Sequence, residues 1–494
     1  MMGVFSKLGT FKSGFWVASA MELLERWAWY GMFAVLALYL TGSTDEGALG
    51  LSHTEKGQIM GIVTAILYLL PIFTGVVADM IGFKLSLIIA YLILASGYYF
   101  MGEVEGYWPV FLVFLWVALG AAMFKPVASA IVTKTTDESN STLGFGIFYM
   151  MVNIGGFIGP AFSSTLRTKY GWKIIFIQAA VVILINLVIL LLFYRESDRV
   201  QRQRERFGDA VMRALKNIGA ALMDKKLTVL LVIMVGFWTM FNQLFYTLPT
   251  FIEDWVDTVE LKAQIAGFST WIAEFMSGGG DRVNPEMMIN IDAGAIVLFQ
   301  IIVSAFVQRM RHVSAMIRGF LVSIIGIGLS FYFNDGLYVI VGIVIFAIGE
   351  MMTNPTFSSF IALISPKGKE ALYMGTYFIP VFLGNFFTGF ISGNLYEAWS
   401  DKLTLLQREM AKRGIDMPEV GAQFSKNEYY QLAAQKLQMT QQQMTDMLWQ
   451  TYHPNKIWYV IVGIGVFTLL ALYVYDLLVI RPNERREEAA KAEL

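Results

Sequence analysis

Residues 75–84 read GVVADMIGFK and join two apolar runs, at about 57–79 and 83–101. Each run is close to the roughly 20 residues that a helix needs to cross a bilayer. Gly82 can adopt the backbone conformation of a sharp turn, and Asp79 can bind the N-terminus of a neighbouring helix in one state and release it in another. The stretch therefore predicts two antiparallel membrane helices joined by a short turn.

The composition of the whole chain agrees with a membrane protein. Of its 494 residues, 56% are hydrophobic and 15% are charged, and the mean hydropathy is +0.56. A soluble domain seldom carries so little charge. The net charge of −1 gives no indication of nucleic-acid binding. The absence of cysteine excludes disulfides, thiolate metal sites and a cysteine nucleophile, and three scattered histidines argue against a metal cluster. We expect no metal and no cofactor.

Apolar runs of similar length recur along the chain and predict twelve membrane helices. The first six are expected near residues 14–41, 57–79, 83–101, 108–132, 143–167 and 172–194. The second six are expected near 226–252, 287–309, 316–333, 337–363, 371–396 and 456–480. The predicted fold class is an all-α membrane protein.

Lysine and arginine in the connecting segments predict the orientation. They concentrate in the segments that lie on the same side as both chain ends, above all in 195–225. Arg167, Lys169 and Lys173 are a local exception on the other side. Because cytoplasmic loops carry the excess of positive charge, we expect both termini in the cytoplasm. The expected location is the cell membrane, as in a bacterial inner membrane.

The basic segment 195–225 divides the spans six and six, and we expect it to be a solvated linker lying against anionic lipid. A second insertion, 397–455, should lie outside the membrane; its stretch TQQQMTDMLWQTY suits an amphipathic helix capped by Thr440. The expected domains are an N-terminal six-helix bundle (1–194), the cytoplasmic linker (195–225), a C-terminal six-helix bundle (226–480) and a cytoplasmic tail (481–494).

Twelve spans in two sixes resemble the major facilitator superfamily, in which two bundles rock around a central site. The turn that joins the second and third spans carries the matching signature, G-x-x-x-D-x-x-G-x-[RK]. Its matching residues are Gly75, Asp79, Gly82 and Lys84. The alternative is an ordinary polar turn. The resemblance implies a fold of two six-helix bundles.

The first span contains three charged residues, in the stretch MELLERWAWYG at 21–31. Each costs roughly 2.5–3.5 kcal/mol on insertion scales. Glu22, Glu25 and Arg26 share one helical face, with Tyr30 one turn further on. That face should look into the bundle or a water-filled cavity. A packing salt bridge is the alternative, but it would neutralise one glutamate and leave the other unexplained.

Two further ionisable groups lie inside predicted spans. Lys125 directly precedes Pro126 in span four, and Glu350 lies five residues before Pro355 in span ten. Together with the first-span set they make three acids and two bases, so one carboxyl group lacks a cation. A desolvated carboxyl group without a partner tends to hold a proton. We therefore expect these charges to handle protons and substrate.

The first-span stretch ELLERWAWYG resembles the E-x-x-E-R-F-x-Y-Y motif of proton-dependent oligopeptide transporters. Other fragments follow in family order: ILYLLPIFTGVVAD, FYMMVNIGGFIGP, FWTMFNQ, GEMMTNP and GTYFIPVFLGN. The resemblance covers most of the membrane portion and implies proton-coupled import of peptides. It assigns proton coupling to Glu22, Glu25 and Arg26, with Arg26 also near the peptide carboxylate and Lys125 paired with the motif. It further implies that Tyr30, Tyr68 and Asn153 line the peptide site and that Glu350 makes a gating contact. Packing is the alternative role for the tyrosines and for Asn153.

The chain departs from this family at several positions. Asn242 stands where span seven usually has a glutamate, and we place it with the substrate site. Asp292-Ala293 replaces the usual Asn-Pro pair of span eight, so Asp292 is a further candidate for proton coupling. Trp27 and Trp29 replace Phe and Tyr. The chain is thus a divergent member by resemblance.

The predicted function is secondary active transport, with proton-coupled symport of di- or tripeptides or related small zwitterions as the leading form. The expected partners are a peptide-like solute, protons and the lipid bilayer, with the chain a monomer. Alternatives are a carrier for another solute, efflux of a drug, or a nutrient sensor whose insertion 397–455 docks a partner. Arg26 and Lys125 argue against lipophilic cations. The sequence shows no nucleophile–base pattern of an enzyme and no phosphate-binding G-x-x-x-x-G-K-[ST] loop.

Overall fold

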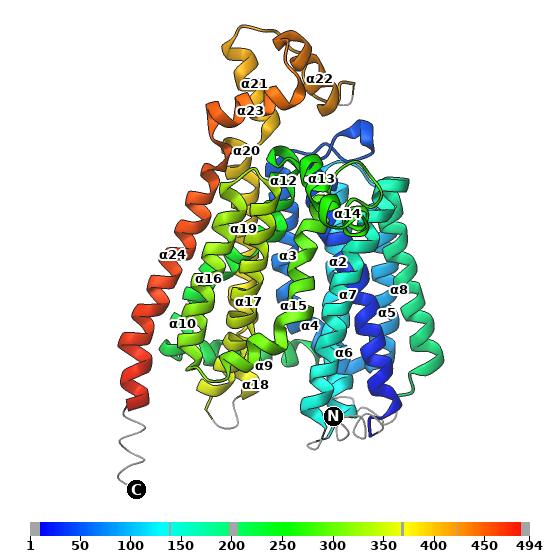
Figure 1. The fold of residues 1–494 in the computed structure, drawn as a ribbon. Coiled ribbons are helices and arrows are strands. Elements are labelled where there is room, and N and C mark those ends of the chain that lie inside the picture. The colour runs from blue at the N-terminus through cyan, green and yellow to red at the C-terminus, as the bar shows by residue number, and fades with distance from the viewer. Residues whose placement is uncertain (1–9, 138–139, 197–205, 367–369, 422, 486–494) are drawn as a thin grey trace.

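The computed structural model describes residues 10–137, 140–196, 206–366, 370–421 and 423–485. Long helices run side by side between two ends of the molecule (Figure 1). The first helix begins and the last helix ends at the same end, which we call the termini side. Residues 397–455, which we call the headpiece, stand above the opposite end, the headpiece side (Figure 1).

The N-terminal helices, which we call the N-half, follow the predicted spans closely. They are α2 (Ser13–Thr41), α3 (His53–Leu69), α4 (Pro71–Ile81), α5 (Phe83–Met101), α6 (Tyr107–Thr135), α7 (Ser141–Tyr170) and α8 (Lys173–Phe193). α3 and α4 form one span bent by 44°. The bend lies at Pro71, whose missing N–H interrupts the helical hydrogen bonds.

The C-terminal helices, the C-half, are more broken than predicted. They are α10 (Lys225–Phe241), α11 (Gln243–Tyr246), α12 (Leu248–Trp255), α13 (Thr258–Phe268), α14 (Thr270–Ser277), α15 (Pro285–Val307), α16 (His312–Tyr332), α17 (Gly336–Ile364), α18 (Glu370–Gly375), α19 (Phe378–Phe390), a π-helical segment (Ile391–Leu395), α20 (Tyr396–Trp399), α24 (Ile457–Tyr475) and a second π-helical segment (Asp476–Ile480). Spans seven and eleven, predicted near 226–252 and 371–396, are each divided into shorter helices. Span seven is interrupted at Asn242, before α11, and at Thr247, before α12, and span eleven is interrupted between α18 and α19.

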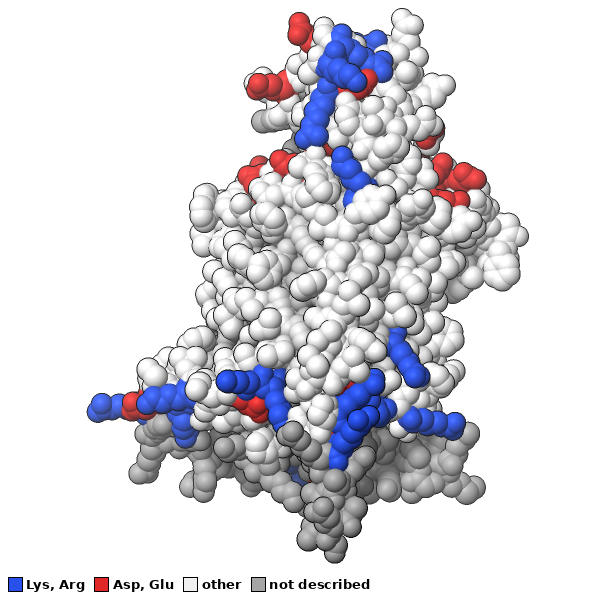
Figure 2. Space-filling model, turned by 90° about the vertical axis from the view of Figure 1, so that its left-hand side faces the viewer, with Lys and Arg blue, Asp and Glu red and all other residues white. Residues whose placement is uncertain are grey.

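The described helices match an all-α membrane fold. Ten of them are long and apolar enough to cross a membrane, and the bent pair α3–α4 is an eleventh. α2, with 29 residues, completes the predicted twelve, although its three charges lower its hydropathy. On the face in Figure 2, a belt without charged side chains separates basic residues at the termini side from the mixed charges of the headpiece. Such a belt suits contact with lipid.

Buried apolar side chains form two large clusters. One is drawn from residues 11–194 together with Tyr246, and the other from 221–480 together with Ala161. In the first cluster α2 packs against α7 and α8, while in the second α17 packs against α15 and α16. Each half therefore has a core of its own, as two bundles that move against each other require.

The linker contains a helix that the sequence analysis did not predict. α9 (Phe207–Leu222) packs against α4 and α18 at the termini side. Its outer face exposes Phe207, Met212 and Leu215, which suits the surface of a membrane. The most basic stretch of the linker, 197–205, lies outside the described residues.

The headpiece is folded and has three helices, α21 (Lys402–Lys412), α22 (Lys426–Leu437) and α23 (Gln441–Tyr452). Thr440 caps α23 as predicted, and Gln443 completes a capping box with it. Met444 and Leu448, one turn apart, are the buried positions of this helix. The prediction of an amphipathic helix here is confirmed.

Candidate functional site

The three charged residues of α2 form one buried cluster. Arg26 Nε donates to Glu25 Oε2 over 2.6 Å and lies 3.5 Å from Glu22 Oε1. Glu22 Oε2 and Glu25 Oε1 have no hydrogen-bond partner among the described residues. One arginine therefore serves two acids, and a simple packing salt bridge does not account for the second acid.

Glycines of α7 let that helix pack directly against α2, which carries the charged cluster. A Cβ atom added at Gly155 would lie 2.3 Å from the carbonyl oxygen of Leu23, and one added at Gly159 would lie 2.5 Å from that of Trp27. No larger residue fits without moving the backbones apart. The glycines of FYMMVNIGGFIGP thus let α7 lie backbone to backbone against the charged part of α2.

Lys125 lies well inside α6 but its side chain is exposed. Its Nζ is 5.7 Å from the ring centre of Tyr68 and 5.9 Å from that of Phe378 in the C-half. No carboxylate of the described residues lies within ion-pair distance of it, so the expected pairing with the first-span motif is absent in this conformation. Lys125 is therefore a cation that faces the other half and is open to a ligand.

The C-half contributes two acids opposite these cations. Asp292 on α15 and Glu350 on α17 lie on two helices that pack against each other, and their carboxyl groups interact electrostatically. Asp292 Oδ1 and Glu350 Oε2 have no hydrogen-bond partner among the described residues. Glu350 also interacts electrostatically with Tyr30 of the N-half, so the acids and the charged face of α2 border the same central region.

Three further candidates for the substrate site, Tyr68, Asn153 and Asn242, lie in different surroundings. Tyr68 stacks on Phe378 with 5.9 Å between ring centres. Asn153 donates to the carbonyl oxygen of Tyr149 in its own helix over 2.9 Å. Asn242 ends α10, where span seven breaks, and its Nδ2 has no partner among the described residues. Of these three residues, Tyr68 is the one for which the described contacts reach both Lys125 and the C-half.

The signature turn lies at the termini side, separate from the central charges. Gly82 has a φ of +94°, which confirms the need for glycine at the turn. Asp79 is exposed, and Glu196 Oε1 instead accepts a hydrogen bond from the N–H of Phe83 at the start of α5, over 2.9 Å. Lys84 donates to the carbonyl oxygen of Tyr194 over 3.2 Å. The sequence analysis missed Glu196, because nothing in the local pattern shows that α8 ends beside α5.

The two halves are closed against each other at the headpiece side. A Cβ atom at Gly57 of α3 would lie 2.2 Å from the carbonyl oxygen of Gly389 in α19, so these helices touch backbone to backbone. Arg167 binds Glu286 through two hydrogen bonds of 2.9 and 3.1 Å between α7 and α15. Lys56 adds a bond of 3.2 Å to the carbonyl oxygen of Tyr246.

Two of the three basic residues that depart from the charge pattern at the headpiece side, Arg167 and Lys173, form ion pairs. Arg167 binds the fully buried Glu286 of the other half. Lys173 lies 2.6 Å from Glu103 on its own half.

Comparisons with known proteins agree with this architecture. Residues 16–291, more than half of the chain, match the family model described as Major Facilitator Superfamily. A dipeptide and tripeptide permease A from Serratia proteamaculans (strain 568) is 30% identical over 188 residues, which cover 37% of this chain and 36% of the permease. That alignment spans only about a third of each protein, but it confirms the resemblance to peptide transporters.

Solved structures share the fold over nearly the whole chain. A crystal structure of a POT family transporter in complex with 5-aminolevulinic acid has a TM-score of 0.65 at 18% identity, with 95% of this chain and 96% of that one covered. The nucleoside transporter NupG has a TM-score of 0.66 at 13% identity, with 94% and 99% covered. The similar scores of two carriers with different ligands show that the fold alone does not select a substrate. The chain is a multi-pass membrane protein that belongs to the major facilitator superfamily.

Proposed function

We propose that the chain is a proton-coupled secondary carrier for di- or tripeptides or related small zwitterions, and that it works by alternating access. The observation that carries this proposal is the charge arrangement between the halves. The N-half offers Arg26 and the unpaired Lys125, and the C-half offers Asp292 and Glu350. The similarity to a dipeptide and tripeptide permease supports the same substrate class.

The opposed charges favour a zwitterion. A substrate carboxylate would bind Lys125 and Arg26, and a substrate ammonium group would face the acids of α15 and α17. Two cations in a region of low dielectric attract an anionic group strongly, although desolvation offsets much of the gain. A ligand with both charges satisfies both sides at once. Tyr30, Tyr68, Asn153 and Asn242 would complete the walls of this site.

Glu22 and Glu25 are the proposed coupling acids. Asn242 cannot titrate, so the protons must bind elsewhere. Protonation of one α2 acid would release N–H donors of Arg26 to bind the substrate carboxylate. Deprotonation of that acid would restore its ion pair with Arg26. This gives the protonated and deprotonated carriers different affinities for substrate, which is what coupling requires. Asp292 and Glu350 would supply a second protonation site in the C-half.

The proposed orientation places the headpiece outside and both termini in the cytoplasm of a bacterial cell, with the carrier a monomer in the cell membrane. The described conformation would then be closed to the outside. In the same proposal, 1–194 and 226–480 are the two moving bundles, the linker 195–225 connects them in the cytoplasm, and 481–494 is a cytoplasmic tail. The turn at Gly75, Asp79, Gly82 and Lys84 would change its contacts as the bundles rock.

Counterflow in proteoliposomes tests the substrate class. Vesicles preloaded with one unlabelled compound each, from sets of di- and tripeptides, amino acids, nucleosides and cationic drugs, are given a labelled dipeptide outside. We expect di- or tripeptides to drive uptake and Lys125→Ala to reduce it. No uptake of the labelled dipeptide into vesicles loaded with di- or tripeptides, together with exchange of a labelled nucleoside or cationic drug by the same protein, would contradict the proposal.

A further inference from the structure

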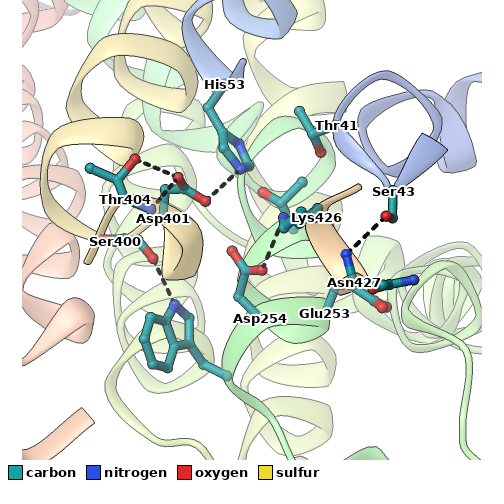
Figure 3. Close-up of polar contacts among 12 residues, drawn as sticks. Thr41, Ser43, His53, Glu253, Asp254, Ser400, Asp401, Thr404, Lys426 and Asn427 are labelled. Atoms are coloured by element: carbon teal, nitrogen blue, oxygen red, sulfur yellow. Dashed lines mark hydrogen bonds and ion pairs between the residues drawn. The ribbon is translucent and has the colours of Figure 1, made fainter. Parts of the chain in front are cut away.

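The headpiece belongs covalently to the C-half, but it binds an acidic turn of the N-half. The N–H of Asn427 donates to Ser43 Oγ over 3.1 Å (Figure 3). The side-chain amide of Asn427 donates to Asp45 over 3.2 Å and to Glu46 over 2.9 Å. One headpiece residue thus holds the loop between α2 and α3 through its backbone and its side chain.

A second set of contacts joins the headpiece to the start of α3. Glu397 Oε2 accepts a hydrogen bond of 2.7 Å from the N–H of Thr54 in the first turn of that helix. A carboxylate is favoured at this place by the partial positive charge of a helix N-terminus. His53 Nε2 lies 3.3 Å from Asp401 Oδ1, and both side chains are buried (Figure 3). These contacts cross the boundary between the two halves.

Charges of both signs are buried beneath these contacts. Asp254 Oδ1 lies 3.8 Å from Lys426 Nζ, and Asp254 Oδ2 accepts a hydrogen bond of 2.7 Å from the Tyr396 hydroxyl. Burial alone would lower the pKa of Lys426, but the carboxylates of Asp254 and Asp401 raise it above its usual value. The cluster is therefore held together by its own ion pairs.

The spacing of three groups in this cluster would also suit a metal ion, because ligand atoms of His53, Asp254 and Asp401 lie within 4.8 Å of one another. However, Lys426 already lies 3.8 Å from Asp254, and His53 lies 3.3 Å from Asp401. A divalent ion would add a large uncompensated charge in a buried place. The cluster is better explained as a contact between parts of the protein.

We propose that the headpiece is a latch that holds the headpiece side of the carrier closed. This inference rests only on the alternating-access part of the proposed function, and not on the substrate. A carrier must open this side once in each cycle, so the contacts of Asn427, Glu397 and Asp401 with the N-half must break and reform. The headpiece thereby sets how often this side opens.

Cross-linking tests the latch directly, because the chain has no cysteine of its own. Ser43→Cys/Asn427→Cys would tie the headpiece to the N-half. Tyr332→Cys/Asn455→Cys is the matched control, because Asn455 donates to the carbonyl oxygen of Tyr332 in the same half over 3.0 Å. Oxidation should reduce counterflow by about tenfold or more in the first pair, with recovery on reduction, and leave the control pair unchanged. Full transport by the oxidised first pair would overturn the proposal.

A distance measurement tests the latch without any substrate. Spin labels at Glu105→Cys, in an exposed loop of the N-half, and at Gln442→Cys, on the exposed face of the headpiece, report how far the headpiece stands from the N-half. Asn427→Ala should raise the population of longer distances about tenfold, and Gln441→Ala, which lacks such contacts, should not. Identical distributions in the two variants would refute the latch even if peptide transport is established. A longer distance in Asn427→Ala alone would support it even if the substrate is not a peptide.

Discussion

Gly389→Ala is the substitution for which the structure gives the sharpest expectation. The added Cβ atom would lie 2.4 Å from the carbonyl oxygen of Gly57 and 2.7 Å from the Cα atom of Gly61. Both are backbone atoms, so they cannot rotate away as a flexible side chain would. Ordinary contacts begin near 3.4 Å, and α3 and α19 must therefore separate by about 1 Å.

The cost of this separation applies to the state that is closed at the headpiece side. Overpacking of this kind typically costs about 1–3 kcal/mol. If the open state separates the two helices, as alternating access requires, the cost shifts the equilibrium towards it by roughly 5- to 150-fold. Electron–electron distance measurements between spin labels at Glu105→Cys and Asp281→Cys, one on each half at this side, would record the shift.

Gly463→Ala is the matched control. It makes the same chemical change in another membrane helix, α24, where an added Cβ atom meets nothing within 4 Å. We expect this variant to give the distance distribution of the unmodified carrier, with longer distances only in Gly389→Ala. If Gly389→Ala also retains the original distribution, the close approach of α3 and α19 does not control the closure.

Three further predictions concern individual charges. Arg26→Lys should weaken substrate binding about tenfold or more, because lysine lacks the planar, two-pronged guanidinium group of arginine. Equilibrium binding measures this loss. Unchanged affinity in both Arg26→Ala and Lys125→Ala would contradict the assigned site. Arg167→Ala leaves Glu286 buried without its partner and should lower the free energy of unfolding by about 3–5 kcal/mol. The double variant Arg167→Ala/Glu286→Gln should regain part of this free energy. An Arg167→Ala variant as stable as the unmodified protein would refute the contribution of this ion pair. Burial would raise the pKa of Asp401, but His53 and Lys426 hold it well below its usual value of about 3.8. The stabilising contribution of the Asp401 carboxylate is therefore present above pH 3.8 and is lost as the pH falls below that value. The label distance between headpiece and N-half should not lengthen between about pH 8 and 5, and lengthening in that range would count against the assignment.

Hydropathy and helical spacing predicted much of the fold. Runs of apolar residues placed α5, α6 and α8 within a few residues, because a helix must satisfy its backbone within the segment. The spacing of Glu22, Glu25 and Arg26 predicted one charged face, and the structure joins these residues in one cluster. These features depend only on neighbours in the chain.

Features that depend on distant residues could not be predicted in this way. The contact of Gly57 with Gly389 requires knowledge of which helices pair, and the proximity of Asp292 to Glu350 requires the packing of α15 on α17. The contacts of the latch could not be predicted for the same reason, because Asn427 and Ser43 are more than 380 positions apart in the sequence. Lys125 has no carboxylate within ion-pair distance among the described residues, and this depends on the arrangement of the two halves, which local sequence does not specify.

Accumulation of substrate under a pH gradient tests the central claim most directly. Proteoliposomes that contain the unmodified carrier, Glu22→Gln or Glu25→Gln are given labelled substrate, first with an inward proton gradient and then in counterflow without one. We predict that Glu25→Gln abolishes accumulation but largely keeps counterflow, because exchange needs no net movement of protons. If Glu22→Gln and Glu25→Gln carriers both still concentrate substrate under the gradient, proton coupling does not run through the charged face of α2.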